Sequence, residues 1–228
     1  MQISYTMSDR KSVSSHILAV FDLDGTLTKG LSVEQFFMLY LLKTRKIGIR
    51  SLLSTVAYWA RNVLIDPVEA RQKNKRYLKG KRVGDVETWI DEFFIANDKI
   101  IFSQNVVDIA ARHKQRLHKS ILITGSPSIL AAKLPLNDLF DHVYSTALEA
   151  SLNVFTGKTS GPHYYGLHKE HLVKQLAGEL NASLERSFCY ANSCDDIPML
   201  SLFGNPVAVH PDKGLKKYAR DHEWQLIE

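Results

Sequence analysis

The sequence has few cysteines and no long apolar run, and both shortages exclude whole classes of protein. Its two cysteines, Cys189 and Cys194, lie close together among 228 residues. A secreted disulfide framework needs more cysteines with wider spacing, and a zinc finger needs further ligands, so we expect reduced thiols and a cytoplasmic protein. The apolar runs 17–21 and 36–42 are too short for a signal-peptide core or a membrane span.

The sequence also lacks internal repeats, low-complexity tracts and a strong charge of one sign. Its net charge of +5 is a mild excess that suits an anionic substrate, a membrane surface or nucleic acid. Because no basic and aromatic recognition motif accompanies that charge, we expect no nucleic-acid partner. Apolar residues make up 45% of the chain, which is enough for the core of one α/β domain with a smaller insert.

Short β-rich apolar runs alternate with helical patterns along most of the chain. The runs are residues 17–21, 121–124, 187–192 and 207–209, and the helical patterns cover 105–118 and 167–180. Such alternation predicts βαβ units and a parallel sheet, with ligands bound at the carboxyl ends of its strands. We therefore expect an α/β fold, namely a Rossmann-like three-layer core.

The stretch from 31 to 101 reads as mostly helical, with breaks at Pro67 and Gly80–Gly84, and shows no convincing strand. We interpret it as a helical cap inserted after the first strand. The predicted domains are then a core of residues 1–30 and 102–228 and a cap of residues 31–101. Residues 143–159 have the pattern of short strands around a turn, which predicts a hairpin at the edge of the sheet.

The first strand ends in two acids, Asp22 and Asp24, followed by glycine and threonine. At a strand end both carboxylates can face one site, where one can attack phosphorus and the other can protonate a leaving oxygen. Together they also suit a hard cation such as Mg²⁺. The competing interpretation is a purely structural acidic turn.

The second strand ends in Thr124, Gly125, Ser126 and Pro127. Hydroxyl and amide groups in that order can donate hydrogen bonds to a phosphoryl group. The structural alternative makes Ser126 the N-cap of the next helix, with Pro127 in its first position. The two interpretations are compatible, because phosphate sites often use the start of a helix.

Two further sequence features bring charge to the same predicted edge. Lys169, at the start of a helix, can neutralise phosphoryl charge, although a lysine in such a polar run is usually a solvated surface residue. The third strand runs into Asn192, Asp195 and Asp196, which can complete a cation site. The alternative for these acids is a helix start where the macrodipole favours negative charge.

Four segments together resemble the haloacid dehalogenase-like phosphohydrolases, and best their phosphoserine-phosphatase-like branch. They are FDLDGT (21–26), ITGSP (123–127), DIPML (196–200) and GNPVAVHPD (204–212). The resemblance implies that Asp22 forms an aspartyl-phosphate, that Asp24 is the acid and base, and that Lys169 is a positive clamp. It further implies phosphoryl binding by Thr124 and Gly125, and Mg²⁺ held by Asp22, Asp24, Asn192 and Asp196.

Two departures from the family pattern affect the expected function. Asn192 stands where the family usually has a metal-binding aspartate, so we expect weaker metal binding, and a silent binding module is the alternative. Leu31 stands where phosphoserine phosphatases have the glutamate that binds the substrate's amino group. The expected substrate is therefore another phosphate monoester, either a small metabolite or a lipid phosphate. A mutase would use the same aspartates and differ only in its product.

The cap segment 36–65 mixes apolar side chains with five lysines and arginines. One interpretation is a weak contact with a membrane surface, in which apolar side chains insert and cations face anionic headgroups. The other is an ordinary cap with a packed apolar face and a solvated basic face, and the sequence alone favours this second interpretation.

Overall fold

A seven-stranded sheet forms the centre of the protein, in the strand order β4-β3-β2-β1-β5-β6-β7. The computed structural model describes residues 15–65 and 74–228. All neighbouring strands run parallel except β3 and β4. The arrangement confirms the predicted α/β fold. The strands are β1 Leu18–Phe21, β2 Lys119–Pro127, β3 His142–Ser151, β4 Val154–Ser160, β5 Phe188–Ala191, β6 Asn205–Val209 and β7 Gln225–Ile227.

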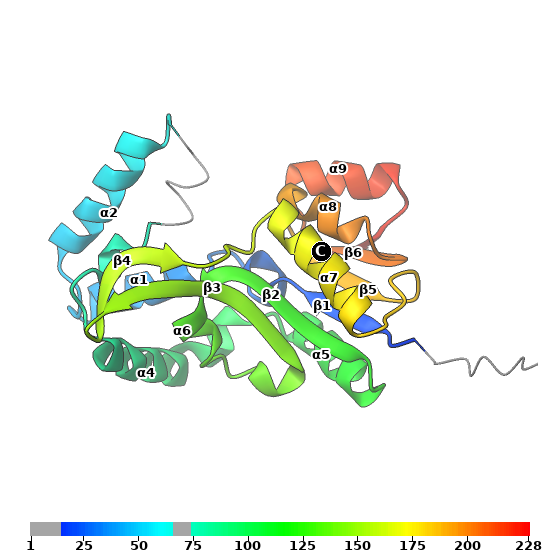
Figure 1. The fold of residues 1–228 in the computed structure, drawn as a ribbon, viewed down its shortest axis with the longest axis horizontal. Coiled ribbons are helices and arrows are strands. Elements are labelled where there is room, and N and C mark those ends of the chain that lie inside the picture. The colour runs from blue at the N-terminus through cyan, green and yellow to red at the C-terminus, as the bar shows by residue number, and fades with distance from the viewer. Residues whose placement is uncertain (1–14, 66–73) are drawn as a thin grey trace, which may run out of the picture.

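Helices cover both faces of the sheet, because β1 is apolar on both sides. Leu18 and Val20 face α7 (Leu167–Glu179), α8 (Ile197–Leu200) and α9 (Lys213–Asp221) in one buried cluster. Ala19 and Phe21 join a second cluster with α5 (Gln104–Gln115) and α6 (Ser128–Ala131). Figure 1 shows the two helix groups above and below the sheet, which is the predicted three-layer architecture.

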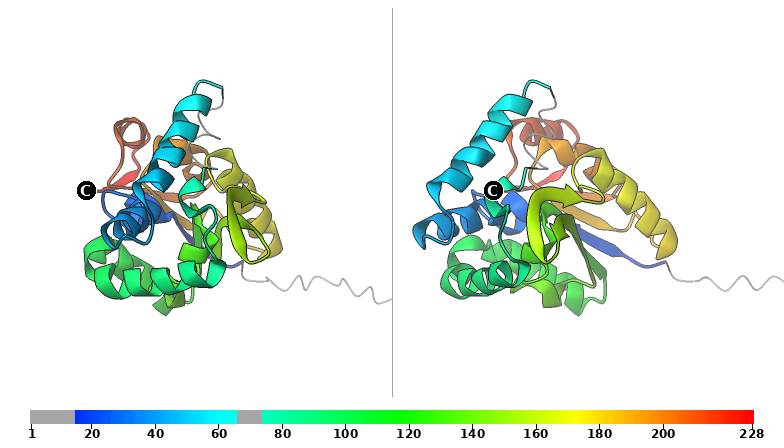
Figure 2. Two further views of the ribbon diagram at one scale, coloured as in Figure 1. Left: turned by 90° about the vertical axis from the view of Figure 1, so that its left-hand side faces the viewer. Right: turned by 60° about the vertical axis from the view of Figure 1, so that its left-hand side comes forward.

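The region between β1 and α5 is largely helical. It contains α1 (Val33–Lys43), α2 (Ile49–Asn62), the short helix η2 (Arg76–Leu78) and α4 (Val83–Ile101). Buried side chains of α1 and α4 belong to the same cluster as Phe21, so the cap and one sheet face share a continuous core. By contrast, no residue of α2 is buried, and the structure describes all of them. Figure 2 shows α2 standing apart from the body of the protein.

The cap boundaries at 31 and 101 stay a prediction, and its expected breaks are only partly testable. Pro67 lies outside the described residues. Gly80 has a φ of +78° in the turn after η2, where a glycine is favoured. Gly84, however, lies within the first turn of α4 and does not break the helix. No helix in residues 15–65 or 74–228 is both long and apolar enough to cross a bilayer.

The predicted edge hairpin is present as β3 and β4, and it also reaches the cap. Backbone amides of Gly80 and Val83 donate to carbonyls of Phe155 and Asn153 at 2.9 and 3.0 Å. Gly157 has a φ of +84°, and a Cβ there would lie 3.0 Å from Lys79 Cβ, so a glycine is favoured where β4 approaches the cap. The hairpin therefore ties one side of the cap to the sheet.

Candidate active site

The carboxyl ends of three adjacent strands bring the predicted site residues together. Asp22 directly follows β1, the segment 124–126 lies in β2, and Asn192 directly follows β5. Since β1 lies between β2 and β5, these ends meet at one edge of the sheet. A cavity of about 420 Å³ lies there, between the core and the cap. Its core side is lined by Asp22, Asp24, Gly125, Ser126, Lys169, Asn192, Asp195 and Asp196, among others.

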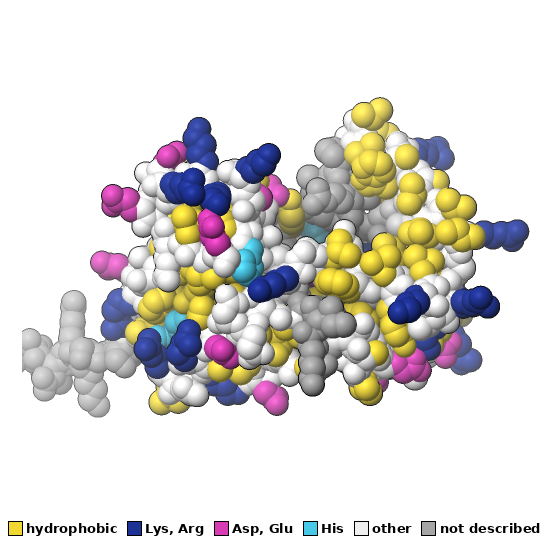
Figure 3. All heavy atoms as spheres, turned by 180° about the vertical axis from the view of Figure 1, so that it is seen from behind, with side chains coloured by type: hydrophobic (Ala, Val, Ile, Leu, Met, Phe, Trp, Pro, Cys, Tyr) yellow, Lys and Arg dark blue, Asp and Glu magenta, His cyan; other side chains and the backbone are white. Residues whose placement is uncertain are grey.

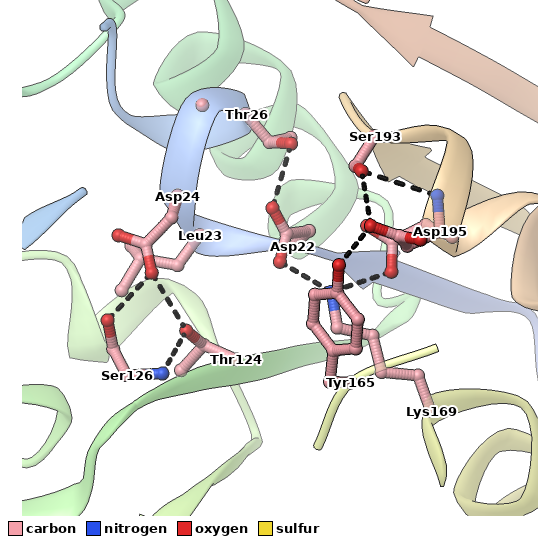
Figure 4. Close-up of polar contacts among 12 residues, drawn as sticks. Asp22, Leu23, Asp24, Thr26, Thr124, Ser126, Tyr165, Lys169, Ser193 and Asp195 are labelled. Atoms are coloured by element: carbon pink, nitrogen blue, oxygen red, sulfur yellow. Dashed lines mark hydrogen bonds and ion pairs between the residues drawn. The ribbon is translucent and has the colours of Figure 1, made fainter. Parts of the chain in front are cut away.

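Lys169 forms the centre of a buried charge cluster (Figure 4). Its Nζ lies 2.6 Å from Asp22 Oδ1 and 2.9 Å from Asp196 Oδ1. Burial raises the pKa of Asp196 to about 6 and also raises that of Asp22, while the Lys169 charge opposes both shifts. Burial alone would lower the pKa of Lys169, but the two carboxylates raise it above its ordinary value. The lysine is thus a fixed cation and not a solvated surface residue.

The turn after Asp22 depends on a glycine. Thr26 Oγ1 donates to Asp22 Oδ2 at 3.1 Å across this turn. Gly25 has a φ of +83°, and a Cβ on it would lie 2.0 Å from the side-chain nitrogen of Asn192. The amide of Asn192 therefore packs directly on the turn that carries Asp22 and Asp24, and only glycine leaves room for it.

The side chain of Asp24 points away from Asp22, toward β2 and the cap. Its Oδ2 accepts a hydrogen bond from Ser126 Oγ at 2.7 Å, and its Oδ1 accepts one from the Val33 amide of α1 at 2.8 Å. Burial raises the pKa of Asp24, and these two hydrogen bonds oppose the shift. Asp24 is thereby linked to the first turn of a cap helix, which the sequence did not indicate.

The loop at the end of β2 differs from the predicted helix cap. The strand continues to Pro127, and α6 begins at Ser128 with no side-chain cap hydrogen bond. Ser126 is not an N-cap, because its hydroxyl is bonded to Asp24 and its amide donates to Thr124 Oγ1 at 3.0 Å. Thr124 is fully buried, whereas Gly125 and Ser126 line the cavity.

His163 was not assigned to the site from sequence but lies over Gly125. A Cβ on Gly125 would be 3.2 Å from His163 Cε1, and His163 Nδ1 lies 2.8 Å from the buried Thr146 hydroxyl. The imidazole therefore forms one wall directly above the loop expected to bind phosphate. The only signal in the sequence was its place among several histidines.

The loop after β5 is held by Asp212, just before α9. Asp212 accepts hydrogen bonds from the amides of Cys194 and Leu215, both at 2.8 Å, and its own amide donates to the Asn192 carbonyl at 2.9 Å. Asp195, in turn, accepts hydrogen bonds from Tyr165 and Ser193 at the cavity wall. Asp196, rather than Asp195, joins Asp22 and Lys169.

The donor atoms around Asp22 fit a magnesium ion. Within residues 15–65 and 74–228 there is no set of three His, Cys, Asp or Glu side chains grouped to hold a metal ion. The available donors are oxygens of residues that line the cavity, namely the Asp22 and Asp196 carboxylates, the Asp24 backbone carbonyl and the Asn192 side-chain carbonyl. Mg²⁺ is usually held by one or two carboxylates, with waters and substrate phosphate completing its shell. This chemistry suits such a site and excludes a soft metal.

The cap wall of the cavity carries a buried ion pair that sequence analysis missed. Lys75 Nζ lies 2.5 Å from Glu34 Oε2, and the Tyr77 hydroxyl donates to Glu34 Oε1 at 3.0 Å. Burial and the Glu34 charge raise the pKa of Tyr77 well above its ordinary value. Lys75 stands in the basic run KNKRYLKGKR, which gave no reason to single it out.

The arrangement of buried acids, a fixed lysine and a glycine turn at one strand edge agrees with the comparison to known families. The model for "haloacid dehalogenase-like hydrolase" matches residues 19–201. The chain belongs to the haloacid dehalogenase-like hydrolase family, and it is a phosphatase of that family. Phosphatases of this family generally use Mg²⁺ and an aspartyl-phosphate.

Individual relatives cover nearly the whole chain. Phosphoserine phosphatase SerB1 of Mycobacterium tuberculosis is 29% identical over 91% of this chain and 69% of its own length. Histidinol-phosphatase of Neisseria meningitidis is 23% identical over 92% of this chain and 97% of its own.

Solved structures agree on the fold. A Bordetella pertussis protein of unknown function has a TM-score of 0.80 at 23% identity, covering 94% of this chain and 99% of that one. A phosphoserine phosphatase carrying an analogue of the phospho-aspartyl intermediate has a TM-score of 0.66 at 19% identity, covering 94% of each chain. These likenesses show the α/β fold of the family.

Proposed function

We propose that this protein is a Mg²⁺-dependent phosphomonoesterase that works through an aspartyl-phosphate on Asp22. The observation that carries the proposal is the Asp22–Lys169–Asp196 cluster at the floor of the cavity. The buried Lys169 ammonium bridges the carboxylates of Asp22 and Asp196 there. Thr26 donates a hydrogen bond to Asp22, which lines the cavity. Such a fixed charge pattern is suited to phosphoryl transfer, where catalysis depends on positioning and charge stabilisation.

In the first step a carboxylate oxygen of Asp22 attacks phosphorus, and the bond from phosphorus to the alcohol oxygen breaks. Asp24 donates its proton to that leaving oxygen, and its raised pKa favours the protonated form this requires. Lys169 and the backbone amide of Gly125, a residue that lines the cavity, stabilise charge on the phosphoryl oxygens. Asp22, the Asp24 backbone carbonyl, Asn192 and Asp196 would hold Mg²⁺, which would supply further positive charge.

In the second step water attacks the phosphorus of the aspartyl-phosphate, and the bond to the Asp22 oxygen breaks. Asp24, now ionised, accepts the proton from that water, so phosphate leaves and both acids return to their first state. For these steps the Asp24 side chain has to exchange its hydrogen bond with Ser126 for one with substrate or water. The cap above the cavity limits the access of other water molecules.

We propose that Glu34 does not bind an amino group of the leaving alcohol. Both oxygens of Glu34 are already engaged, by Lys75 and by Tyr77, and the carboxylate is half-buried. A substrate ammonium would have to displace a buried ion pair to reach it, which is costly. Although relatives are named for phosphoserine and histidinol phosphate, we propose a hydroxylated metabolite or a lipid phosphate as substrate.

Hydrolysis of a generic aryl phosphate across a Mg²⁺ titration tests the proposed function. Asp22→Asn should abolish turnover, and Asp24→Asn should let a hydroxylamine-sensitive phosphoenzyme accumulate. Asp195→Asn is the matched control, because this acid borders the same cavity but bonds to Tyr165 and Ser193 instead of Lys169. Substantial turnover by Asp22→Asn would disprove the mechanism.

The competing proposal is a silent binding module, which rests on Asn192 alone. It predicts a wild-type protein that is inactive at every Mg²⁺ concentration and an Asn192→Asp variant that is active. A cytoplasmic location is also proposed here, supported by the two free thiols Cys189 and Cys194.

A further inference from the structure

Helix α2 directs its apolar face away from the protein, unlike an ordinary cap helix. Ile49, Leu53 and Val56 follow one another at helical spacing, yet they are 61, 58 and 50% exposed. Trp59 flanks the same face at 43% exposure. An amphipathic helix in a globular protein normally directs such a stripe to the core. Here the apolar face points outward and has no cover from the described residues.

The polar side of α2 faces the protein instead. Thr55 lines the active-site cavity, and its carbonyl accepts a hydrogen bond from Asn74 Nδ2 at 2.8 Å. The Tyr58 ring is covered by the guanidinium of Arg76, 4.6 Å from its centroid. These contacts fix the rotation of the helix, so the outward apolar face is a consequence of how α2 is held.

The segment that carries this apolar face has charges of one sign only. No aspartate or glutamate occurs between residues 35 and 65. Lys43, Arg45, Arg50 and Arg61 are all exposed, while Lys46 is paired with Glu92. Figure 3 shows the hydrophobic surface over this part of the molecule, with lysines and arginines at its border.

We propose that the outward face of α2 docks on an anionic membrane surface. The combination of an exposed apolar stripe, a flanking tryptophan and two arginines on a helix without acids is the pattern of an interfacial helix. Each basic residue near an anionic surface contributes attraction, and the apolar side chains enter the headgroup region. A second copy of the chain fits this face poorly, since pairing two α2 helices would bring two all-positive borders together.

Docking would also place the active site at the level of the lipid headgroups. An interfacial helix buries its apolar face about 5–10 Å deep, and a helix with its side chains is about 10 Å across. The opposite face of α2, with Thr55, would then lie among the headgroups. On the basis of the proposed function, the substrate class becomes a lipid that carries a phosphate monoester.

Vesicle flotation at low salt tests the docking. The wild-type protein should float with vesicles of phosphatidylcholine containing anionic phosphatidylglycerol, and should not float with phosphatidylcholine alone. The double variant Leu53→Glu/Val56→Glu should bind the vesicles at least roughly tenfold more weakly, because two apolar side chains are lost from the interface. Ile95→Glu is the control, since Ile95 is also an exposed apolar residue of the cap, at 84% exposure, but belongs to α4.

A charge variant keeps the test valid if the acidic double variant fails to fold. Arg50→Gln/Arg61→Gln should weaken binding and reduce its dependence on salt. Failure of the wild type to float, or equal flotation of Leu53→Glu/Val56→Glu, overturns the proposal. So does a wild-type dimer that the double variant disperses, because a second copy would then cover this face.

The substrate part is separated from docking by activity measured on the same samples. Asp22→Asn should float like the wild type and hydrolyse nothing. The wild type should hydrolyse a glycerolipid phosphate monoester in anionic vesicles faster than the Leu53→Glu/Val56→Glu variant, with equal rates on soluble aryl phosphate. Aryl phosphate turnover without lipid hydrolysis overturns the lipid substrate alone, whereas no turnover of either overturns the proposed function.

Discussion

Replacement of Lys169 by methionine should lower the free energy of unfolding far more than replacement of a surface lysine. The change removes the cation that lies 2.6 Å from Asp22 and 2.9 Å from Asp196, and it leaves two buried carboxylates close together. Breaking a buried ion pair in this way costs about 3–5 kcal/mol. For a chain of this length, that loss lowers the melting temperature by roughly 10 °C. The assay is thermal unfolding in EDTA, so that bound cations do not compensate.

The same helix supplies the control. Lys174 pairs with Glu170 at the same distance, 2.6 Å, but its side chain is 53% exposed where that of Lys169 is 4% exposed. Lys174→Met should therefore cost at most about 0.5 kcal/mol. Adding Asp196→Asn to Lys169→Met removes one of the stranded charges and should recover part of the stability. Equal, small shifts for Lys169→Met and Lys174→Met would refute this reasoning.

Three further predictions concern other parts of the structure. His113 lies 2.8 Å from the Tyr190 hydroxyl, and burial, with the neighbouring charges of His118 and two arginines, lowers its pKa to about 4. Because the unfolded chain binds this proton near pH 6.5, stability should fall as the pH drops from 6.5 toward 4, by about 2 kcal/mol between pH 7 and 5. The His113→Gln variant, measured by denaturant unfolding, should not show this loss of stability at low pH. A pH dependence equal to that of the wild type would contradict the role of His113. Gly25→Ala should lose nearly all aryl phosphate turnover, since its Cβ would lie 2.0 Å from the Asn192 amide; near-normal rates would show that the turn can adapt. Asn192→Asp should lower the Mg²⁺ concentration for half-maximal turnover by roughly tenfold through its added charge, and a raised requirement would contradict that role.

The elements that local pattern specifies were predictable from the sequence. Buried parallel strands are short apolar runs that end abruptly, and the runs before Asp22 and Asn192 and through Thr124 are all strands near the predicted places. Because β1 lies between β2 and β5 in the sheet, the ends of these three strands bring the residues to one edge. The predicted helix 105–118 is present but ends at Gln115, because Leu117 takes a positive φ of 58°.

Contacts between distant segments could not be read in the same way. The Glu34–Lys75 pair joins residues 41 positions apart, and no local pattern marks either of them. Ser126 looked like a helix cap because Ser-Pro often starts a helix, but a tertiary hydrogen bond to Asp24 replaces that role. For α2 the sequence left two interpretations open and favoured a packed apolar face, because its periodicity shows that an apolar face exists and not which way it points.

Uneven burial within the cap determines which part of it can open. Helices α1 and α4 share the core of the sheet, so their amides should exchange with solvent only when the whole domain unfolds. Helix α2 is held by surface contacts such as those of Thr55 with Asn74 and Tyr58 with Arg76, each worth about 1 kcal/mol. The amides of α2 should therefore exchange with solvent at a lower free energy of opening than those of α1 and α4. Helix α2 is therefore the part of the cap expected to open locally over the cavity, whereas α1 and α4 should be as stable as the core.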